Sequence, residues 1–329
     1  MYFDGISSLN VLKKDFDLFW KFYPAALTRM AYLKITGKKL RCPVYGGGKI
    51  VYSQDKGNEM LKEGLKGDKP FMFGRHGSNE LLIASHGLML DKGIINKIDC
   101  DKLSVGCDHS GFFPNEQESH RKFNKLIEQA SAQCDVYGTF RMTMEDYYIK
   151  HFMPKDVQLT HLNMLDFWRY DQPYTIALKG QKVLVVHYLA NQIEDQYKKR
   201  ELLFNNPSVL PEFELMTMPA VQTIAGNRDP RFKDWFEALD FMYEETKKYD
   251  YDVALLGCGA YGMPLAAKLK KDGKKVVYMG GVLQMLFGIW GKRWESEPGA
   301  VALRNEYWVS PDPKFIPKNS ETVEEGCYW

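Results

Sequence analysis

The sequence predicts an α/β fold: a Rossmann-like, mostly parallel sheet with helices on both faces, plus an N-terminal helical segment. Two observations lead to this prediction. From about residue 70 onward, short apolar runs typical of buried strands alternate with longer amphipathic stretches typical of helices. Residues 251–281, YDVALLGCGAYGMPLAAKLKKDGKKVVYMGG, also combine a strand, a glycine-rich loop, a helix and a second strand in a single unit.

In this unit the apolar run 253–256 leads directly into a loop that contains Gly257, Gly259, Tyr261 and Gly262. Glycines let the backbone approach a ligand, and the free N–H groups at the start of the next helix attract an anion such as a diphosphate. We therefore expect these four residues to contact a nucleotide. The other interpretation is that the glycines only let the helix pack closely on the strand.

The second strand of the unit, residues 275–278, ends in Met279, Gly280 and Gly281. A dinucleotide site needs Asp or Glu at this point to bind the ribose hydroxyls. The sequence therefore disfavours NAD, and an NAD(P)-type oxidoreductase is kept as an alternative function.

The composition is that of a soluble globular protein: 329 residues, of which 45% are hydrophobic and 26% charged, with a formal net charge of +2. A charge so near balance gives no reason to expect a nucleic-acid partner. The six cysteines form no CxxC pair, as is usual for reduced intracellular thiols. No signal peptide opens the chain and no apolar stretch is long enough to span a bilayer, so we expect a cytoplasmic protein.

Three regions are expected along the chain. Residues 1–60 are an N-terminal helical extension that packs on the core, residues 61–310 a catalytic domain, and residues 311–329 a loosely docked tail. Within the extension, residues 15–36 carry aromatic and aliphatic side chains at helical spacing, with Lys and Arg around them. Such a helix could also lie on an anionic membrane, so peripheral membrane contact is a second interpretation.

A second strand-loop-helix junction begins with an expected strand at residues 69–74 and continues as Arg75-His76-Gly77-Ser78-Asn79-Glu80. Ser78 or Asn79 could cap the helix, and the helix dipole favours a carboxylate at Glu80. Arg, His and Glu directly after a strand also provide a phosphate ligand, a proton carrier and a ligand for a hard metal. Parallel sheets bind their ligands at this end of their strands.

The stretch RHGSNELL resembles the R-[FY]-G-D-G-E-[FL] motif of the GT-D-type glycosyltransferases, which glycosylate bacterial surface polysaccharides and adhesins. The strand end at 255–257, the helix and the strand that closes on Gly280 and Gly281 are similar to a later segment of that family. The two matches bracket residues 71–281. In the family, the Asp-x-Glu pair is associated with metal and nucleotide-sugar binding. The resemblance therefore implies Mn²⁺ or Mg²⁺ at Glu80, although Ser78 stands where the family has Asp.

Further elements follow in order. Residues 116–133 are expected to form a helix, and Asp135 opens a short strand, where it either takes part in catalysis or makes a turn. Residues 144–168 are expected to be helical. Residues 183–186 are the clearest buried strand, with His187 at the carboxyl end.

Arg200 lies in a charged helical stretch after His187, and the two could hold a diphosphate; a solvated charged face is the other interpretation. Residues 216–224 and 229–248 are expected to be a strand and an amphipathic helix. Residues 282–294 mix glycines, large aromatics, Gln284 and Arg293, which suits one wall of a ligand pocket.

Together these observations favour a glycosyltransferase that moves a sugar from a nucleotide sugar, with a UDP-sugar as the favoured donor, to a glycan or lipid-linked acceptor of a bacterial surface glycan. A non-catalytic sugar-nucleotide-binding relative is a further alternative, because Ser78 replaces the family's Asp. The expected catalytic residues are Glu80, His76 and Asp135, with Glu80 as the metal ligand. The residues expected to bind the donor are Arg75, Gly77, Ser78, Asn79, His187, Arg200, Gly257, Gly259, Tyr261, Gly262, Gln284 and Arg293.

Overall fold

The computed structural model describes residues 35–36, 44–45, 48–140, 142 and 144–329, and its centre is a nine-stranded sheet with the order β1-β2-β5-β4-β3-β9-β8-β6-β7. Only β1 and β2 pair antiparallel, and all the other neighbours run parallel. The strands are β1 (Val44–Tyr45), β2 (Lys49–Tyr52), β3 (Phe71–Gly74), β4 (Val136–Thr139), β5 (Gln158–His161), β6 (Lys182–His187), β7 (Glu214–Pro219), β8 (Val253–Gly257) and β9 (Lys275–Tyr278).

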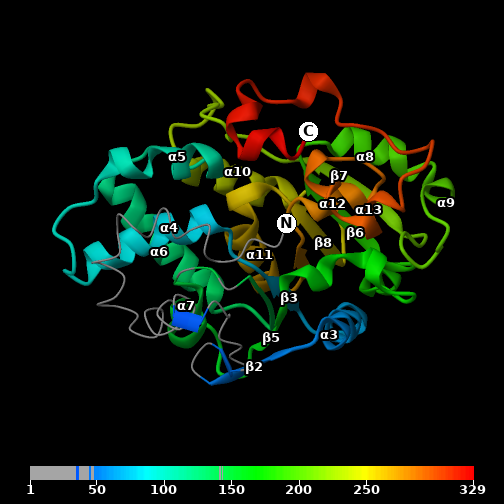
Figure 1. Cartoon of the computed structure of the whole chain (residues 1–329), viewed down its shortest axis with the longest axis horizontal. Helices are drawn as coiled ribbons and strands as arrows, with labels where there is room; N and C mark the ends of the chain where they lie inside the picture. Colours follow the sequence, from blue (N-terminus) through cyan, green and yellow to red (C-terminus); the bar gives the residue numbers. More distant parts are fainter. Residues whose placement is uncertain (1–34, 37–43, 46–47, 141, 143) are drawn as a thin grey trace.

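Helices connect these strands (Figure 1). The α-helices are α3 (Gln54–Lys66), α4 (Ser78–Asp91), α5 (Cys100–Ser110), α6 (Gln117–Ser131), α7 (Glu145–Phe152), α8 (Ala190–Tyr197), α9 (Arg200–Leu203), α10 (Trp235–Thr246), α11 (Gly262–Lys271), α12 (Val282–Leu286) and α13 (Pro298–Val301). Short 3-10 helices lie at Leu162–Leu165, Phe167–Arg169, Tyr174–Leu178, Gly259–Tyr261, Lys292–Trp294, Pro313–Phe315, Ser320–Thr322 and Glu324–Gly326.

The sheet is covered on both faces, which confirms the predicted fold class. Alternate residues of β6 show this division: Leu184 and Val186 belong to one apolar core and Val183 and Val185 to the other. Helices α4, α5, α6, α7, α10 and α11 supply the first core, and α3, α8, α9, α12 and α13 the second. In Figure 1, α4 to α7 gather at one end of the molecule, and α8, α9, α12 and α13 at the other.

Three of the described α-helices begin at a residue whose side chain caps them. Ser53 caps α3 by accepting a hydrogen bond from the N–H of Lys56, and Asp99 caps α5 in the same way. The expected helix at 229–248 begins later, at Trp235, because the side chain of Asp234 accepts from the N–H of Glu237. The capping residue, rather than the apolar pattern, sets the first turn.

One expected element is wrong. Residues 144–168 do not form a single helix, because α7 ends before Pro154 and the chain then enters β5. This strand lies between β2 and β4, with Thr160 opposite Gly138. Four residues of mixed polarity carry little local strand signal, so their pairing partners determine the structure.

The expected N-terminal extension falls largely outside the described residues, including most of residues 15–36. Of the part that is described, β2 joins the sheet and the expected boundary at residue 60 lies inside α3. Among the described residues, no helix combines the length and the apolar composition needed to cross a membrane.

Strand order fixes where a ligand can enter. From β3 the chain proceeds to β4 on one side, whereas β9, the other neighbour of β3, is reached from β8. The loop after β3 leads into α4, which packs in the first core, and the loop after β9 leads into α12, which packs in the second, so the two loops leave toward opposite faces of the sheet. Open parallel sheets bind their ligands at the carboxyl ends of the strands beside such a switch point. The name crevice is used for this place, where the loops after β3, β8 and β9 meet.

Candidate functional site

Three loops meet at this crevice: residues 75–77 after β3, 258–261 after β8, and 279–281 after β9. Nη1 of Arg75 lies only 2.7 Å from the point that a Cβ on Gly280 would occupy. A Cβ on Gly257 would lie 3.1 Å from the carbonyl oxygen of Gly280. The two strand-loop-helix junctions predicted from the sequence are therefore neighbours in space.

Arg75 is the most distinctive side chain of the site. Its guanidinium lies over the ring of Tyr278, 5.3 Å from the ring centre, and its Nε is buried without a hydrogen-bond partner. Gly280 has φ +66°, and the missing side chain leaves the space that the guanidinium uses. A buried guanidinium N–H without an acceptor is suited to binding an anion.

Glu80 stands in the first turn of α4 and folds back over the residue that caps the helix. A Cβ on Gly77 would lie 1.9 Å from Oε2 of Glu80, so any other residue at this point would push the Glu80 carboxylate aside. Burial raises the pKa of the Glu80 carboxyl, the Arg75 charge opposes this increase, and Glu324 adds to it. Glu80 therefore lies over the start of α4 and accepts a proton more readily than an exposed glutamate does.

Ser78 and Asn79 occupy the first two positions of α4. Ser78 is exposed, and the N-cap residue Gly77 provides no side-chain cap. Oδ1 of Asn79 lies 3.7 Å from the point that a Cβ on Gly106 of α5 would take. Asn79 thus faces α5, and Ser78 faces solvent.

His76 lies in the core rather than in the crevice. Its Nδ1 is 2.7 Å from the hydroxyl of Tyr137 and its Nε2 is 3.1 Å from the hydroxyl of Ser131. The backbone N–H of His76 also donates to Tyr137 Oη, which in turn donates to Glu145. Burial and the neighbouring Arg75 lower the pKa of His76 to about 3, so the ring is neutral. With both ring nitrogens engaged, His76 anchors the loop that carries Arg75.

The glycines of the 257–262 loop divide between two roles. Cβ atoms on Gly257 and Gly262 would lie 2.4 Å from His187 and 2.2 Å from Tyr278, so both glycines allow close packing. Gly259 has φ +57°, and a Cβ there would meet no atom within 4 Å. Its carbonyl oxygen accepts a hydrogen bond of 2.7 Å from Tyr278. Of these three, Gly259 has open space beside it.

Tyr261 and His187 are packing residues at the edge of this loop. The ring of Tyr261 stacks on Trp235 with centroids 4.6 Å apart, and its hydroxyl lies 2.8 Å from Oγ1 of Thr223. Nδ1 of His187 accepts a hydrogen bond from the N–H of Leu189, and burial lowers its pKa to about 3. Both side chains are only 2% exposed.

Gln284 and Arg293 connect the site to the carboxyl-terminal segment, residues 311–329. Nε2 of Gln284 donates to the carbonyl oxygen of Tyr328, and Nη1 of Arg293 donates to the Tyr328 hydroxyl at 2.6 Å. Nη2 of Arg293 also forms an ion pair with Glu324 at 3.1 Å. The sequence pattern did not identify Tyr328 or Glu324; the only signal was an aromatic pair, Tyr328-Trp329, at the end of a Pro- and Glu-rich stretch.

Two expected residues lie elsewhere. Asp135 precedes β4 at the amino ends of the strands, where its carboxylate accepts from the N–H of Met72 and forms an ion pair with Lys270 at 2.7 Å. Arg200 lies on α9 and pairs with Glu201 at 3.0 Å. The structure does not bring either residue to the crevice, and their roles stay predictions.

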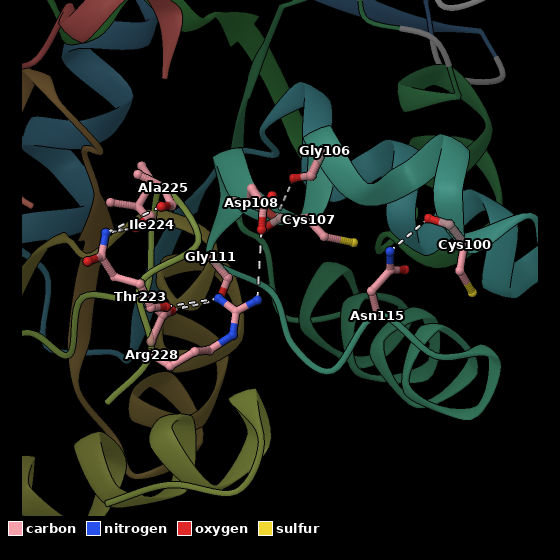
Figure 2. Close-up of polar contacts among 12 residues, drawn as sticks. Cys100, Gly106, Cys107, Asp108, Gly111, Asn115, Thr223, Ile224, Ala225 and Arg228 are labelled. Carbon is pink, nitrogen blue, oxygen red and sulfur yellow. Dashed lines mark hydrogen bonds and ion pairs between the residues drawn. The ribbon is translucent and has the colours of Figure 1, made fainter. Parts of the chain in front are cut away.

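Polar contacts join helix α5 and the residue after it to the loop between β7 and α10 (Figure 2). The N–H of Ala225 donates to the carbonyl oxygen of Asp108, and Oγ1 of Thr223 donates to that of Gly111 at 2.6 Å. Arg228 extends toward Asp108, at 3.8 Å. Because Thr223 also contacts Tyr261, this loop couples α5 to the glycine loop.

The residues present provide little support for a metal site. No group of three or more His, Cys, Asp or Glu side chains suited to a metal ion occurs among the residues that the structure describes. Glu80 is engaged over Gly77, and Ser78 offers only a hydroxyl. The Mn²⁺ or Mg²⁺ requirement implied by the resemblance stays a prediction.

No protein-family model and no curated protein matches the chain. Two solved structures are similar to it, each with a TM-score of 0.42 over 70% of this chain. One is described as "the highly conserved domain of unknown function 1792", with "a distinct glycosyltransferase fold"; it is 11% identical and 77% of its chain is covered. The other, a selenomethionine-substituted structure of the same domain, is 10% identical and 78% covered.

Proposed function

We propose that the protein is a glycosyltransferase that uses a nucleotide sugar, with the donor's diphosphate bound at the crevice between β3 and β9. One observation carries the proposal: the buried Nε of Arg75 has no acceptor, at the point in a parallel sheet where ligands bind. A sugar transfer from a nucleotide donor leaves a nucleoside diphosphate. Positive charge placed at that leaving group stabilises the negative charge that develops in the transition state.

Backbone groups at the same place support the proposal. Helices α4 and α11 both begin at the crevice, and neither N-cap residue makes a side-chain cap hydrogen bond. The first-turn N–H groups and the helix dipoles therefore favour an anion there. The open backbone at Gly259 gives a phosphate room to approach, and Tyr278 links this loop to Arg75.

Glu80 is the best placed proton acceptor for the sugar acceptor's hydroxyl. A carboxylate whose pKa is raised by burial is a stronger base, and it takes the proton while the acceptor oxygen bonds to the sugar carbon. The Arg75 charge opposes the increase of that pKa and so favours the ionised form that acts as a base. His76 has no role in this step, because Tyr137 and Ser131 engage both its nitrogens.

The finer identity of the substrates rests on the motif resemblance. Because RHGSNELL resembles the motif of enzymes that build bacterial surface glycans, we propose a UDP-sugar as donor and a glycan or lipid-linked intermediate as acceptor. The surface glycan that we propose as the product is a capsule, an O-antigen or a glycoprotein glycan. A cytoplasmic site of action follows from this proposal, since nucleotide sugars are the donors.

The test is a thermal-shift screen of the protein with UDP-, GDP-, CMP- and dTDP-sugars and with NAD(P), each with and without Mn²⁺. At 100 times its dissociation constant, a ligand adds about 2.7 kcal/mol of stability, which is readily measured. We expect stabilisation by one class of sugar nucleotide, and a loss of most of that response in Arg75→Gln. The control is Arg121→Gln, which removes an exposed arginine of α6 that pairs with Asp91.

Each alternative has its own outcome. Stabilisation by NAD(P) alone would make the glycine loop an oxidoreductase site and reject the proposal. Binding of a sugar nucleotide without donor turnover in the presence of candidate acceptors would favour a non-catalytic relative. An equal response of Arg75→Gln and the wild type would place the ligand away from the crevice.

A further inference from the structure

The carboxyl-terminal segment, residues 311–329, crosses the same end of the sheet as the proposed donor site. Nδ2 of Asn227 donates to the carbonyl oxygen of Lys318, and the backbone N–H of Arg293 donates to that of Cys327 at 2.8 Å. In Figure 1 the segment, drawn in red, lies beside the yellow-green loop before α10 and above α12. It thus extends from the loop after β7 to the turn after β9.

Two consecutive glycines place this segment next to Arg75. The point that a Cβ on Gly280 would occupy is 2.7 Å from Nη1 of Arg75. The corresponding point on Gly281 is 2.8 Å from Cε1 of Tyr328. Arg75 and Tyr328 therefore border the same short turn, and the Tyr328 hydroxyl accepts a hydrogen bond from Arg293. Arg75 and Arg293 therefore both lie near the turn at Gly280 and Gly281, Arg75 directly and Arg293 through its hydrogen bond to Tyr328.

The two arginines differ in their partners. Nε of Arg75 has no acceptor in the described part of the chain, whereas Nη2 of Arg293 lies 3.1 Å from Oε2 of Glu324. The Arg293 and Glu324 side chains are 37% and 34% exposed, so water can reach the pair. Glu324 is also the charge from this segment that contributes to the raised pKa of Glu80, which places it toward the same crevice.

The backbone that presents Glu324 is unusual. Glu324 and Glu325 have φ values of +47° and +58°, in the left-handed region that non-glycine residues rarely adopt. Such a conformation raises the energy of the segment in this position and makes its release less costly. A partly exposed ion pair on a backbone of this kind is readily exchanged for a stronger anion.

From this geometry we propose that Glu324 is an internal anion that occupies Arg293 until the donor binds, and that Arg293 then joins Arg75 on the diphosphate. The inference rests on the proposed function, since it needs an anionic donor in the crevice. A diphosphate carries more negative charge than one carboxylate and can engage both guanidinium groups, so it displaces Glu324 from Arg293. The carboxyl-terminal segment then inhibits donor binding from within the same chain, because Glu324 and the diphosphate compete for Arg293.

Calorimetric titration with UDP tests this inference in the full-length protein. Glu324→Gln removes the competing charge, and we expect it to bind UDP about fivefold more tightly than the wild type, the size expected for an exposed ion pair. Glu325→Gln is the matched control, because Glu325 is the adjacent glutamate, shares the left-handed backbone and makes no ion pair among the described residues. Its affinity should equal that of the wild type.

A double-mutant comparison assigns the effect to Arg293. In the Arg293→Gln background, Glu324→Gln should produce no gain in affinity, since the charge it competes for is gone. If Glu324→Gln binds UDP no better than Glu325→Gln, the internal anion is rejected; a loss of UDP binding in Arg75→Gln would still uphold the donor site. If neither the wild type nor Glu324→Gln binds UDP or any sugar nucleotide, both proposals fail.

Discussion

The hydroxyl of Tyr137 lies 2.7 Å from Nδ1 of His76 and also accepts a hydrogen bond from the backbone N–H of the same residue. One side chain of β4 thereby holds the loop that follows β3. The same hydroxyl donates to Glu145, whose carboxylate also accepts from the N–H of Phe140. The position of Arg75 therefore depends on a buried polar network one strand away.

Tyr137→Phe removes this hydroxyl and leaves a buried N–H and a buried carboxylate each short of a partner. We expect the free energy of unfolding to fall by about 1–3 kcal/mol in urea denaturation, and nucleotide binding to weaken. Tyr249→Phe is the control, because this half-buried tyrosine makes no hydroxyl hydrogen bond among the described residues. Equal stability of the two variants would show that the network does not hold the loop.

Burial of neutral His187 makes the free energy of unfolding depend on pH. Its pKa is about 3 in the folded protein and 6.5 ordinarily, so between these values the unfolded chain binds the extra proton. The stability contributed by neutral His187 is therefore complete above pH 6.5 and is lost as the pH falls toward 3, by about 1.4 kcal/mol per pH unit.

His187→Asn retains an acceptor for the Leu189 N–H but does not titrate. Between pH 6 and pH 4 we expect the wild type to lose about 2–3 kcal/mol more than this variant in chemical denaturation. The comparison at pH 8, where both side chains are neutral, is the reference. If the stability of the wild type and of the variant changed with pH in parallel, His187 would take up its proton in the folded protein as readily as in the unfolded chain.

Gly280→Ala and Gly273→Ala separate backbone strain from displacement of Arg75. Both glycines have positive φ, +66° and +87°, so either alanine should lower the free energy of unfolding by about 1–2 kcal/mol. Only the alanine at Gly280 meets Arg75, because a Cβ at Gly273 has no atom within 4 Å. We expect only Gly280→Ala to weaken UDP binding in calorimetry. Equal affinities would place the diphosphate away from Arg75.

Glu80→Gln is expected to increase stability near neutral pH. The folded-state pKa of Glu80 is raised above its ordinary 4.5, so the wild type loses stability as the pH rises from 4.5 through the raised value, while glutamine stays neutral. Denaturation at pH 4 and pH 8 should show a difference that grows in favour of the variant. Glu325→Gln controls for removal of an exposed charge. A difference that does not change with pH contradicts burial of the Glu80 carboxylate.

Ser78→Asp tests the metal requirement. The new carboxylate at the first position of α4 should add about 0.3–1 kcal/mol of stability through the helix dipole. With Glu80 it also provides a second hard ligand, so we expect tighter Mn²⁺ binding by calorimetry in the presence of UDP. Ser78→Asn, with the same shape and no charge, should bind Mn²⁺ like the wild type. Identical Mn²⁺ affinity in both variants would show that no metal binds beside Glu80.

Local patterns were sufficient for the parts of the site that follow strands. Arg75 and Gly259 were both predicted as ligand contacts, and both border the crevice, since the residue after a parallel strand always lies at the same end of the sheet. For Asp135, the sequence placed an acid beside a short strand but did not determine which end of the sheet it would reach. Arg200 was one of several charges on a helix, a pattern that many solvated surfaces share.

The α/β class, the strand-loop-helix unit at 253–278 and the cation and carboxylate after β3 could all be predicted from local patterns, because apolar periodicity and glycine placement are local properties. The three-dimensional structure was needed for the strand order, which makes β3 and β9 neighbours at the crevice. It also decided that His76 turns into the core and that Glu324 reaches Arg293. These are contacts between segments that are brought together by burial of apolar surface and by strand pairing, and no local pattern encodes them.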